Sequence, residues 1–200
     1  MPASSGISRA RVIETGIEVL ETHRRVSDVG LREVAERLNL RTQSLYAHVE
    51  GVEDLRRALA LEALSRLSAH LLVEVGGRAG RDAISSIARA YYAFAMEHPG
   101  LYDAVISVRR TDPAINAASD DVTRAMRLAF RAYDLDPVIV IRWNRIVFAG
   151  VHGLVGLVND EVFTTADSPV AALERMIRAF LDGIELDAAA SRENQDDPAS

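Results

Sequence analysis

Apolar residues recur along most of the chain at spacings of three and four residues, which is the period of a helix with one buried face. Ile13, Ile17 and Leu20 show this spacing near the N-terminus. No stretch alternates for long between apolar and polar residues with hairpin dipeptides, so a β-sheet has little to build on. The pattern predicts an all-α fold of about nine helices, at residues 8–24, 31–38, 42–48, 52–75, 81–98, 100–110, 113–134, 137–163 and 168–186.

The sequence predicts two helical domains. Residues 1–51 would form a small N-terminal three-helix domain, and residues 52–186 a larger helical one. Residues 187–200 are rich in Asp, Asn, Ala and Ser and carry almost nothing apolar, a composition typical of disorder. We therefore expect a disordered C-terminal tail.

The stretch LREVAERLNLRTQSLYAHV, residues 31–49, contains two short helices that would share one core. Their inward positions are Leu31, Val34, Ala35 and Leu38 in the first helix and Leu45 and Val49 in the second. Asn39 stands where the chain must turn, and Asn tolerates the left-handed conformation needed there. Ala35 is small enough to let the second helix cross closely. This pattern is typical of a helix-turn-helix motif.

Inward packing of the second helix leaves five polar or aromatic side chains on its outer surface: Thr42, Gln43, Ser44, Tyr46 and His48. Gln can bind the edge of adenine through two hydrogen bonds, Thr can touch a thymine methyl or a phosphate, and Tyr and His can donate to phosphates. This chemistry favours DNA binding. The alternative is a plain helical hairpin in which Tyr46 and His48 pack on their neighbours.

Residues 9–60, and above all the L-Y-x-H-V-x-x-x-E-x-L pattern from Leu45 to Leu55, resemble the N-terminal DNA-binding domain of the TetR/AcrR family of transcriptional regulators. The resemblance implies that Tyr46 and His48 contact the DNA backbone, while residues 42–44 approach bases in the major groove. It implies that Arg32 touches a flanking phosphate. It further implies a homodimer, a double-stranded DNA operator and a small-molecule inducer.

Three positions depart from the family pattern. Asn39 replaces a usual Gly, Arg41 replaces a small capping residue, and Val52 replaces a usual Lys. Arg41 is a poor N-cap but a good phosphate ligand, and together with Arg56 and Arg57 it is a candidate to compensate for the missing Lys. Residues 1–60 hold nine Arg and nine acidic residues and therefore carry no net charge. We expect modest non-specific DNA affinity and a shallow salt dependence.

Aromatic and polar residues gather in the C-terminal part, where a helical bundle needs no polar atoms for packing. A cavity with a few convergent polar groups is the usual composition of a small-molecule site. The residues predicted to bind the ligand are Tyr91, Tyr92, Tyr102, Asn116, Phe130, Trp143, Asn144, Phe148 and His152. Core filling is the alternative for each of them, and a lone His152 among apolar neighbours is typical of a hydrogen-bonded core histidine.

The two last helices are the candidates for dimerisation. Gly150, Gly153 and Gly156 recur every third residue, and each costs helix stability, so close helix contact is a reason for them. The last helix carries an apolar stripe wider than one neighbour needs. The predicted interface, a four-helix bundle across a two-fold axis as in the family, comprises Gly150, Gly153, Leu154, Leu157, Leu173, Met176, Ile177 and Phe180.

Composition adds a few exclusions. With no Cys and no export signal at its start, the chain is expected in the cytoplasm, and the apolar run 146–158 is too short to span a membrane. No His spacing typical of a metal site and no phosphate loop is present, so we expect no enzyme and no cofactor. The sequence predicts a ligand-responsive transcriptional regulator, most simply a repressor released from a palindromic operator by an inducer. The alternative is a helical dimeric adaptor or ligand-binding protein that has lost sequence-specific DNA binding.

Overall fold

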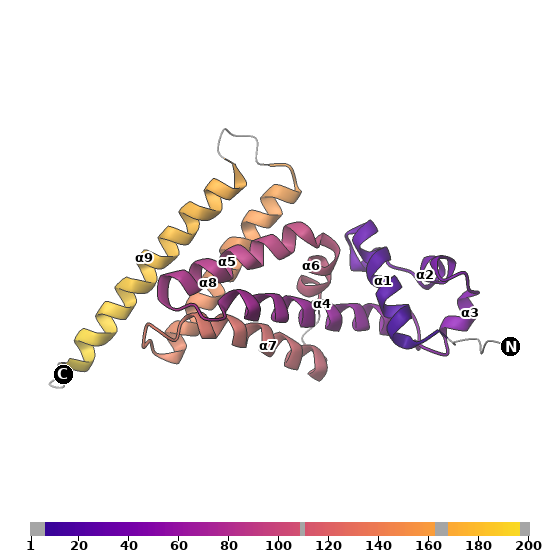
Figure 1. The fold of residues 1–200 in the computed structure, drawn as a ribbon, viewed down its shortest axis with the longest axis horizontal. Helices are drawn as coiled ribbons and strands as arrows, with labels where there is room; N and C mark the ends of the chain where they lie inside the picture. Colours follow the sequence, from indigo (N-terminus) through magenta and orange to yellow (C-terminus); the bar gives the residue numbers. More distant parts are fainter. Residues whose placement is uncertain (1–6, 109–110, 163–167, 197–200) are drawn as a thin grey trace. The chain divides into compact units, whose positions relative to one another are not determined.

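The computed structural model describes residues 7–108, 111–162 and 168–196, and this part is helical with short connections (Figure 1). Its α-helices are α1 (Arg9–His23), α2 (Leu31–Arg37), α3 (Thr42–Leu45), α4 (Val52–Val75), α5 (Gly80–Glu97), α6 (Pro99–Ile106), α7 (Pro113–Ala129), α8 (Pro137–Asn159) and α9 (Pro169–Asp196). A short 3₁₀-helix, η1 (Val26–Asp28), joins α1 to α2. The predicted all-α fold class is confirmed. The predicted helix ends at residues 109–110 and 163 lie outside the described residues.

Local sequence explains where the later helices begin. Proline can occupy the first turn of a helix because the N–H that it lacks would have no partner there. The first residues of α6, α7, α8 and α9 are Pro99, Pro113, Pro137 and Pro169. Before two of these prolines, side chains cap the helix: Asp136 accepts from the Val138 amide at 2.7 Å, and Ser168 accepts from the Ala171 amide at 3.1 Å.

The chain divides into two compact units. The first comprises the residues up to Arg66 together with Glu97–Ser119, and the second comprises Leu67–Met96 and the residues from Asp120 on. The units therefore do not divide at the predicted boundary of residue 52, because α4 contributes to both and α6 belongs with the N-terminal helices.

Two contacts explain why α6 belongs to the first unit. The carboxylate of Glu21, at the end of α1, accepts hydrogen bonds from the amides of Gly100 and Leu101, both at 3.1 Å. Gly100 also approaches α1 closely, since a Cβ added there would lie 2.5 Å from the carbonyl oxygen of Leu20. Only glycine allows this approach, so α6 is fixed directly onto α1.

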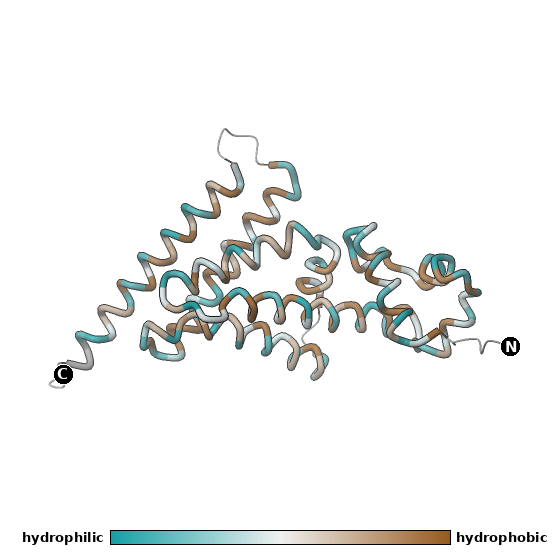
Figure 2. Tube along the Cα trace, viewed as in Figure 1, coloured by the Kyte–Doolittle hydropathy of each residue, from teal (hydrophilic) through white to brown (hydrophobic). Residues whose placement is uncertain are grey.

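The predicted disordered tail is wrong for residues 187–196, which continue α9. The indole N–H of Trp143 on α8 donates to the carboxylate of Asp187 at 2.8 Å, and Ala188 is buried. The Trp143 ring lies against Gly183, where an added Cβ would be 2.8 Å from Cζ2. Figure 2 shows α9 alternating between hydrophobic and hydrophilic positions. Residues 197–200 of the predicted tail lie outside the described residues.

We expect Gly183→Leu to detach the end of α9, because a larger side chain at this position meets the Trp143 ring. The free energy of unfolding should fall by about 1–3 kcal/mol, as for overpacked sites in general. Urea unfolding and hydrogen exchange of residues 184–196 measure the effect. Ala190→Leu, at an exposed position of the same helix, is the control. Equal exchange in both variants would contradict the role of the Trp143 contact.

Candidate functional site

Helices α2 and α3 and the turn between them form a helix-turn-helix with its own buried seam. Val34 and Ala35 of α2 and Leu45 of α3 are buried, as is Val49. Asn39 has a φ of 55° and so adopts the left-handed conformation predicted for the turn. The amide of Leu40 donates to the carbonyl of Ala35 at 2.8 Å, which closes the turn.

Helix α3 is shorter than the predicted 42–48 and ends at Leu45, followed by a turn. The amide of Val49 still reaches the carbonyl of Leu45 at 2.9 Å, so the chain keeps the direction of a helix. Arg41 occupies the N-cap position and makes no side-chain cap, as predicted for a poor capping residue. A helix this short has no stability of its own, so its surroundings must hold it.

An ion pair clamps the segment that follows α3. The guanidinium of Arg9 on α1 donates to both carboxylate oxygens of Asp54 on α4, at 2.9 and 3.0 Å, and also to the carbonyl of His48. The amide of Glu50 donates to the same carboxylate at 3.1 Å. These contacts lower the pKa of Asp54, mainly through the hydrogen bonds from Arg9. The sequence patterns did not identify this clamp, because its two partners lie 45 residues apart.

A second network ties α1 to α2. The imidazole Nε2 of His23 lies 2.6 Å from a carboxylate oxygen of Glu33, and Arg37 bonds both Glu33 and Thr22, at 3.1 and 3.0 Å. The hydrogen bond with His23 is the largest cause of the lowered pKa of Glu33. The helix-turn-helix is thereby attached to α1 at both of its ends.

The predicted DNA-binding side chains lie on the outside of this assembly. Gln43 and Ser44 are exposed, and 57% of Tyr46 is exposed. Thr42 and His48 are half-buried. Within the described residues, Gln43, Ser44 and Tyr46 make no side-chain hydrogen bond, so their polar groups remain available to a partner.

Most arginines near the motif are already engaged. Arg32 donates to Glu36 at 2.8 Å. Arg56 bonds the carbonyls of Ser27 and Val29 and the carboxylate of Glu53, and Arg57 pairs with Asp112. Arg56 and Arg57 are therefore not free to replace the missing Lys. Arg41 is exposed and has no ion pair with any described residue, so it remains the candidate for that contact.

The predicted ligand residues do not all come together. In the second unit, the rings of Tyr91 and Phe148 lie 5.1 Å apart and those of Phe148 and His152 lie 6.1 Å apart. Asn144 is 7% exposed, and neither amide atom has a hydrogen-bond partner among the described residues. Phe130 is buried and Tyr92 is half-buried, with a pKa raised by burial.

Three predicted ligand residues lie elsewhere. Tyr102 and Asn116 belong to the first unit, and Trp143 packs against α9. The sequence assigned them by residue type, and residue type does not specify which packing layer a side chain enters. A cavity of about 610 Å³ does exist, but it lies in the first unit and none of the nine predicted residues lines it.

The predicted dimer residues also separate into two groups. Leu154, Leu173 and Ile177 are buried within one chain, so they cannot supply an exposed interface. Gly150 faces α9 of the same chain: an added Cβ would lie 2.6 Å from the Phe180 ring and 3.0 Å from the Met176 sulfur.

Other positions of α8 remain open. Gly153 has no atom within 4 Å of an added Cβ, and 46% of Leu157 is exposed. Close helix contact within the chain therefore explains Gly150 but leaves Gly153 unexplained.

Among the described residues, α8 is long and apolar enough to cross a membrane by length and composition. The whole helix has 23 residues, more than the run judged too short from the sequence. One such helix is weak evidence, because a core helix can pass the same test. Here α8 carries Arg142 and Arg145 and packs against α9.

The fold and the site together define a helical protein with a helix-turn-helix near its N-terminus. Residues 84–180 match the family model of the tetracyclin repressor-like C-terminal domain. The HTH-type transcriptional regulator YobS of Bacillus subtilis strain 168 is 27% identical over 180 residues, covering 90% of this chain and 93% of the relative. The chain is therefore similar to helix-turn-helix transcriptional regulators and, over residues 84–180, to the C-terminal domain of tetracyclin repressor-like proteins.

Solved structures show the same fold. A regulatory protein of the TetR family from Rhodococcus RHA1 has a TM-score of 0.62 at 19% identity, covering 88% of this chain and 96% of the other. A TetR variant from Acinetobacter baumannii AYE, solved with minocycline, has a TM-score of 0.58 at 19% identity and covers 97% of both chains. The predicted resemblance to the TetR/AcrR family is confirmed.

We expect Asp54→Asn to loosen the clamp and lower the free energy of unfolding at pH 7 by about 1 kcal/mol, a modest value because 45% of the Arg9 side chain is exposed. The pKa of Asp54 is lowered below its ordinary 3.8, so the carboxylate stabilises the fold above that value. This contribution is lost as pH falls through the lowered pKa.

Urea unfolding between pH 7 and pH 3 checks this prediction. The difference between the wild type and Asp54→Asn should be constant near neutral pH and should shrink below about pH 4. Asp120→Asn, the same change at an exposed position of α7 outside the clamp, is the control. A difference that persists unchanged at pH 3 would show that the charge of Asp54 is not what stabilises this segment.

Proposed function

We propose that this chain is a dimeric, ligand-responsive repressor that binds a palindromic DNA operator and is released from it by a small-molecule inducer. The observation that carries the proposal is the outer surface of the helix-turn-helix. The side chains of Gln43, Ser44 and Tyr46 project from a clamped scaffold and form no hydrogen bond with any described residue. In water these exposed groups form hydrogen bonds with solvent. They can exchange that solvent for base edges and phosphates.

The DNA contacts divide into two kinds. Gln43, with Thr42 and Ser44 beside it, approaches base edges and supplies sequence preference. Tyr46, His48, Arg32 and Arg41 contact the phosphate backbone and set the register. Arg32 must then exchange its exposed partner Glu36 for a phosphate, at little cost, because a surface ion pair within one helix is weak.

The dimer would form through the outer face of α8. The inner face of this helix buries Asn144, Val147, Val151 and Leu154. On the opposite face Ile146, Ala149, Gly153 and Leu157 recur at spacings of three and four residues, and all are exposed. A helix that is apolar on both faces needs a second partner, and Gly153 would let that partner approach closely. With a two-fold axis, two recognition helices about 34 Å apart read successive major grooves.

The ligand would act through the second unit, where Tyr91, Asn144, Phe148 and His152 supply aromatic and polar groups. Burying both amide atoms of Asn144 without partners costs roughly 1–3 kcal/mol per group, and a polar ligand group would remove this cost. The minocycline complex of the Acinetobacter baumannii TetR variant supports a small-molecule inducer for this fold. To act as a switch, the inducer must bind the released state more tightly than the DNA-bound state.

A dimeric adaptor without sequence-specific DNA binding is the second candidate. The observation in its favour is electrostatic: Arg9, Arg37, Arg56 and Arg57 are engaged in pairs within the chain. An adaptor would show no DNA sequence selectivity at any salt concentration. A regulator with few free cations would show selective binding with a shallow salt dependence.

We expect Gln43→Ala to weaken binding to the operator by about tenfold or more, since a bidentate base contact contributes roughly 1–3 kcal/mol of discrimination. Tyr46→Ala should weaken binding to all sequences alike, because it removes a phosphate contact. Mobility shifts at two salt concentrations, with DNA from upstream of the gene of this protein, measure both effects. Ser65→Ala, exposed on α4, should change nothing. Absence of selective binding by the wild type would favour the adaptor.

We expect Leu157→Glu to convert the dimer to a monomer, because a charge would enter an apolar interface. Sedimentation velocity measures the change, and operator affinity should fall with it because one recognition helix reads only half of a palindrome. Val73→Glu is the matched control, since Val73 is an exposed apolar residue on α4. A Leu157→Glu variant that remains dimeric would exclude this face of α8.

A further inference from the structure

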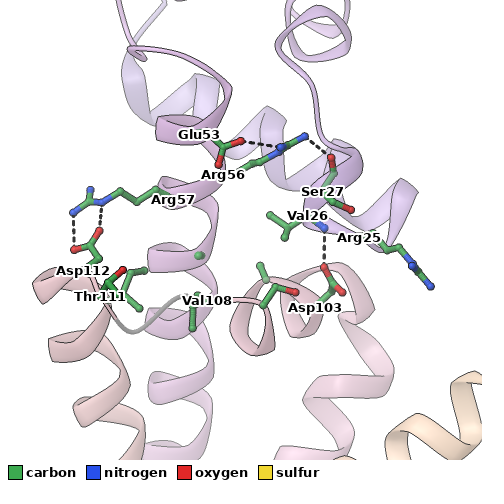
Figure 3. A pocket seen from close by; sticks show the side chains of 14 residues that line it. Arg25, Val26, Ser27, Glu53, Arg56, Arg57, Asp103, Val108, Thr111 and Asp112 are labelled. Carbon is green, nitrogen blue, oxygen red and sulfur yellow. Dashed lines mark hydrogen bonds and ion pairs between the residues drawn. The ribbon is translucent and has the colours of Figure 1, made fainter.

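The first compact unit contains a cavity of about 610 Å³ that the predicted sites do not use. Its walls come from η1, the first turns of α4, the end of α6 and the start of α7 (Figure 3). The volume lies within the range of small-molecule sites, roughly 300–1,000 Å³. None of the predicted ligand residues lines it, and of the residues considered for DNA contacts only Arg56 and Arg57 do.

Five of the fourteen lining residues are apolar, namely Val26, Ala60, Ala104, Val108 and Ile115, and the other nine are polar or charged. Most charged groups around them are closed into pairs. Arg57 bonds Asp112, and Arg56 bonds Glu53, as the dashed lines in Figure 3 show. The carboxylate of Asp103 accepts from the Val26 amide at 2.7 Å.

The remaining polar groups are hydroxyls or point elsewhere. Arg25 has no ion pair with a described residue, and its side chain points away from the other labelled residues in Figure 3. Ser107 and Thr111 carry exposed hydroxyls that form no hydrogen bond within the described part of the chain. A charged ligand would have to compete with the ion pairs of Arg56 and Arg57 or with the hydrogen bond from Val26 to Asp103, whereas an uncharged ligand with one or two polar groups would meet the apolar side chains and the free hydroxyls.

We propose that this cavity binds a small, uncharged and mainly apolar compound, and that its occupancy alters the placement of the DNA-binding helices. The site is distinct from the aromatic residues of the second unit. Its effect on DNA rests on the proposed function, whereas binding itself does not.

The two sides of the cavity are held with different strength. On one side α6 is fixed to α1 by Glu21, by the close approach of Gly100 to Leu20, and by the bond from Val26 to Asp103. On the other side α7 is joined to α4 by the pair of Arg57 and Asp112, an exposed contact that contributes little.

An occupant that needs more room therefore separates α7 from α4 more easily than it displaces α6, and it acts on the start of α4 through Arg57 and through Arg56, which bonds the carbonyls of η1 and Val29. The same first turn of α4 holds Asp54, which clamps the segment after α3. Displacement of α4 would thereby reach the side chains that face DNA.

Fluorescence titration with N-phenyl-1-naphthylamine, an uncharged apolar probe, tests binding without DNA. We expect saturable binding by the wild-type dimer and a loss of affinity of at least tenfold in Val108→Trp, which fills the cavity. Ile106→Trp, at an exposed position of α6 outside the lining, should bind like the wild type. Equal binding by both variants, or no saturable binding by the wild type, would overturn the proposal.

A second measurement does not depend on the folding of a tryptophan variant. Because the chain contains no Cys, Ser107→Cys and Ile106→Cys each introduce a single thiol. Saturating probe should slow modification of Ser107→Cys by N-ethylmaleimide at least fivefold and leave Ile106→Cys unchanged. Equal rates with and without probe in both variants would contradict occupancy of the cavity.

The effect on DNA is measured separately with the upstream fragment. Saturating probe should lower the DNA affinity of the wild type at least fivefold and leave that of Val108→Trp unchanged. Probe binding with unchanged DNA affinity would overturn the coupling. If the protein does not bind DNA selectively, the proposed function fails, while the titration and the thiol protection still decide whether the cavity is a site.

Discussion

The surface that we propose contacts DNA is built on a helix of four residues, and such a helix cannot hold its shape in water. Burial of Leu45 and Val49 fixes its inner side, and the left-handed turn at Asn39 fixes its direction. The pair of Arg9 and Asp54 then ties its trailing end to α1 and α4. The exposed positions of Gln43 and Tyr46 are consequences of these contacts, so the proposed DNA contacts depend on scaffold residues that are not themselves among those contacts.

Charge pairing within the first unit also limits the number of arginines that are free to contact phosphates. Arginine pairs bidentately with carboxylates, and here the acidic residues of the unit engage most of its arginines. The scaffold gains rigidity from these pairs and gives up phosphate contacts in return. Recognition would then depend more on hydrogen bonds to base edges than on general attraction to the phosphate backbone.

Helix α8 has two faces with different structural roles. Its inner face packs in the core of the second unit, and Gly150 lets α9 approach through Phe180 and Met176. Its outer face remains apolar and open at Gly153 and Leu157. Because both faces are apolar, the helix is as hydrophobic in composition as a membrane-spanning one. One face packs within the chain, and the other, as we propose, forms the dimer.

Periodicity and local chemistry determined much of this protein. The sequence by itself specified the all-α class, the helix-turn-helix, the left-handed turn at Asn39 and the outward position of Gln43 and Tyr46, because these follow from the spacing of apolar residues and from backbone preferences. Only the tertiary structure decided which helices join which compact unit, that α9 continues past Asp187, and that Leu154 and Ile177 are used within one chain. Those outcomes depend on contacts between residues far apart in the sequence, such as Trp143 with Asp187 and Glu21 with Gly100, and no local pattern encodes which distant partner a side chain will meet.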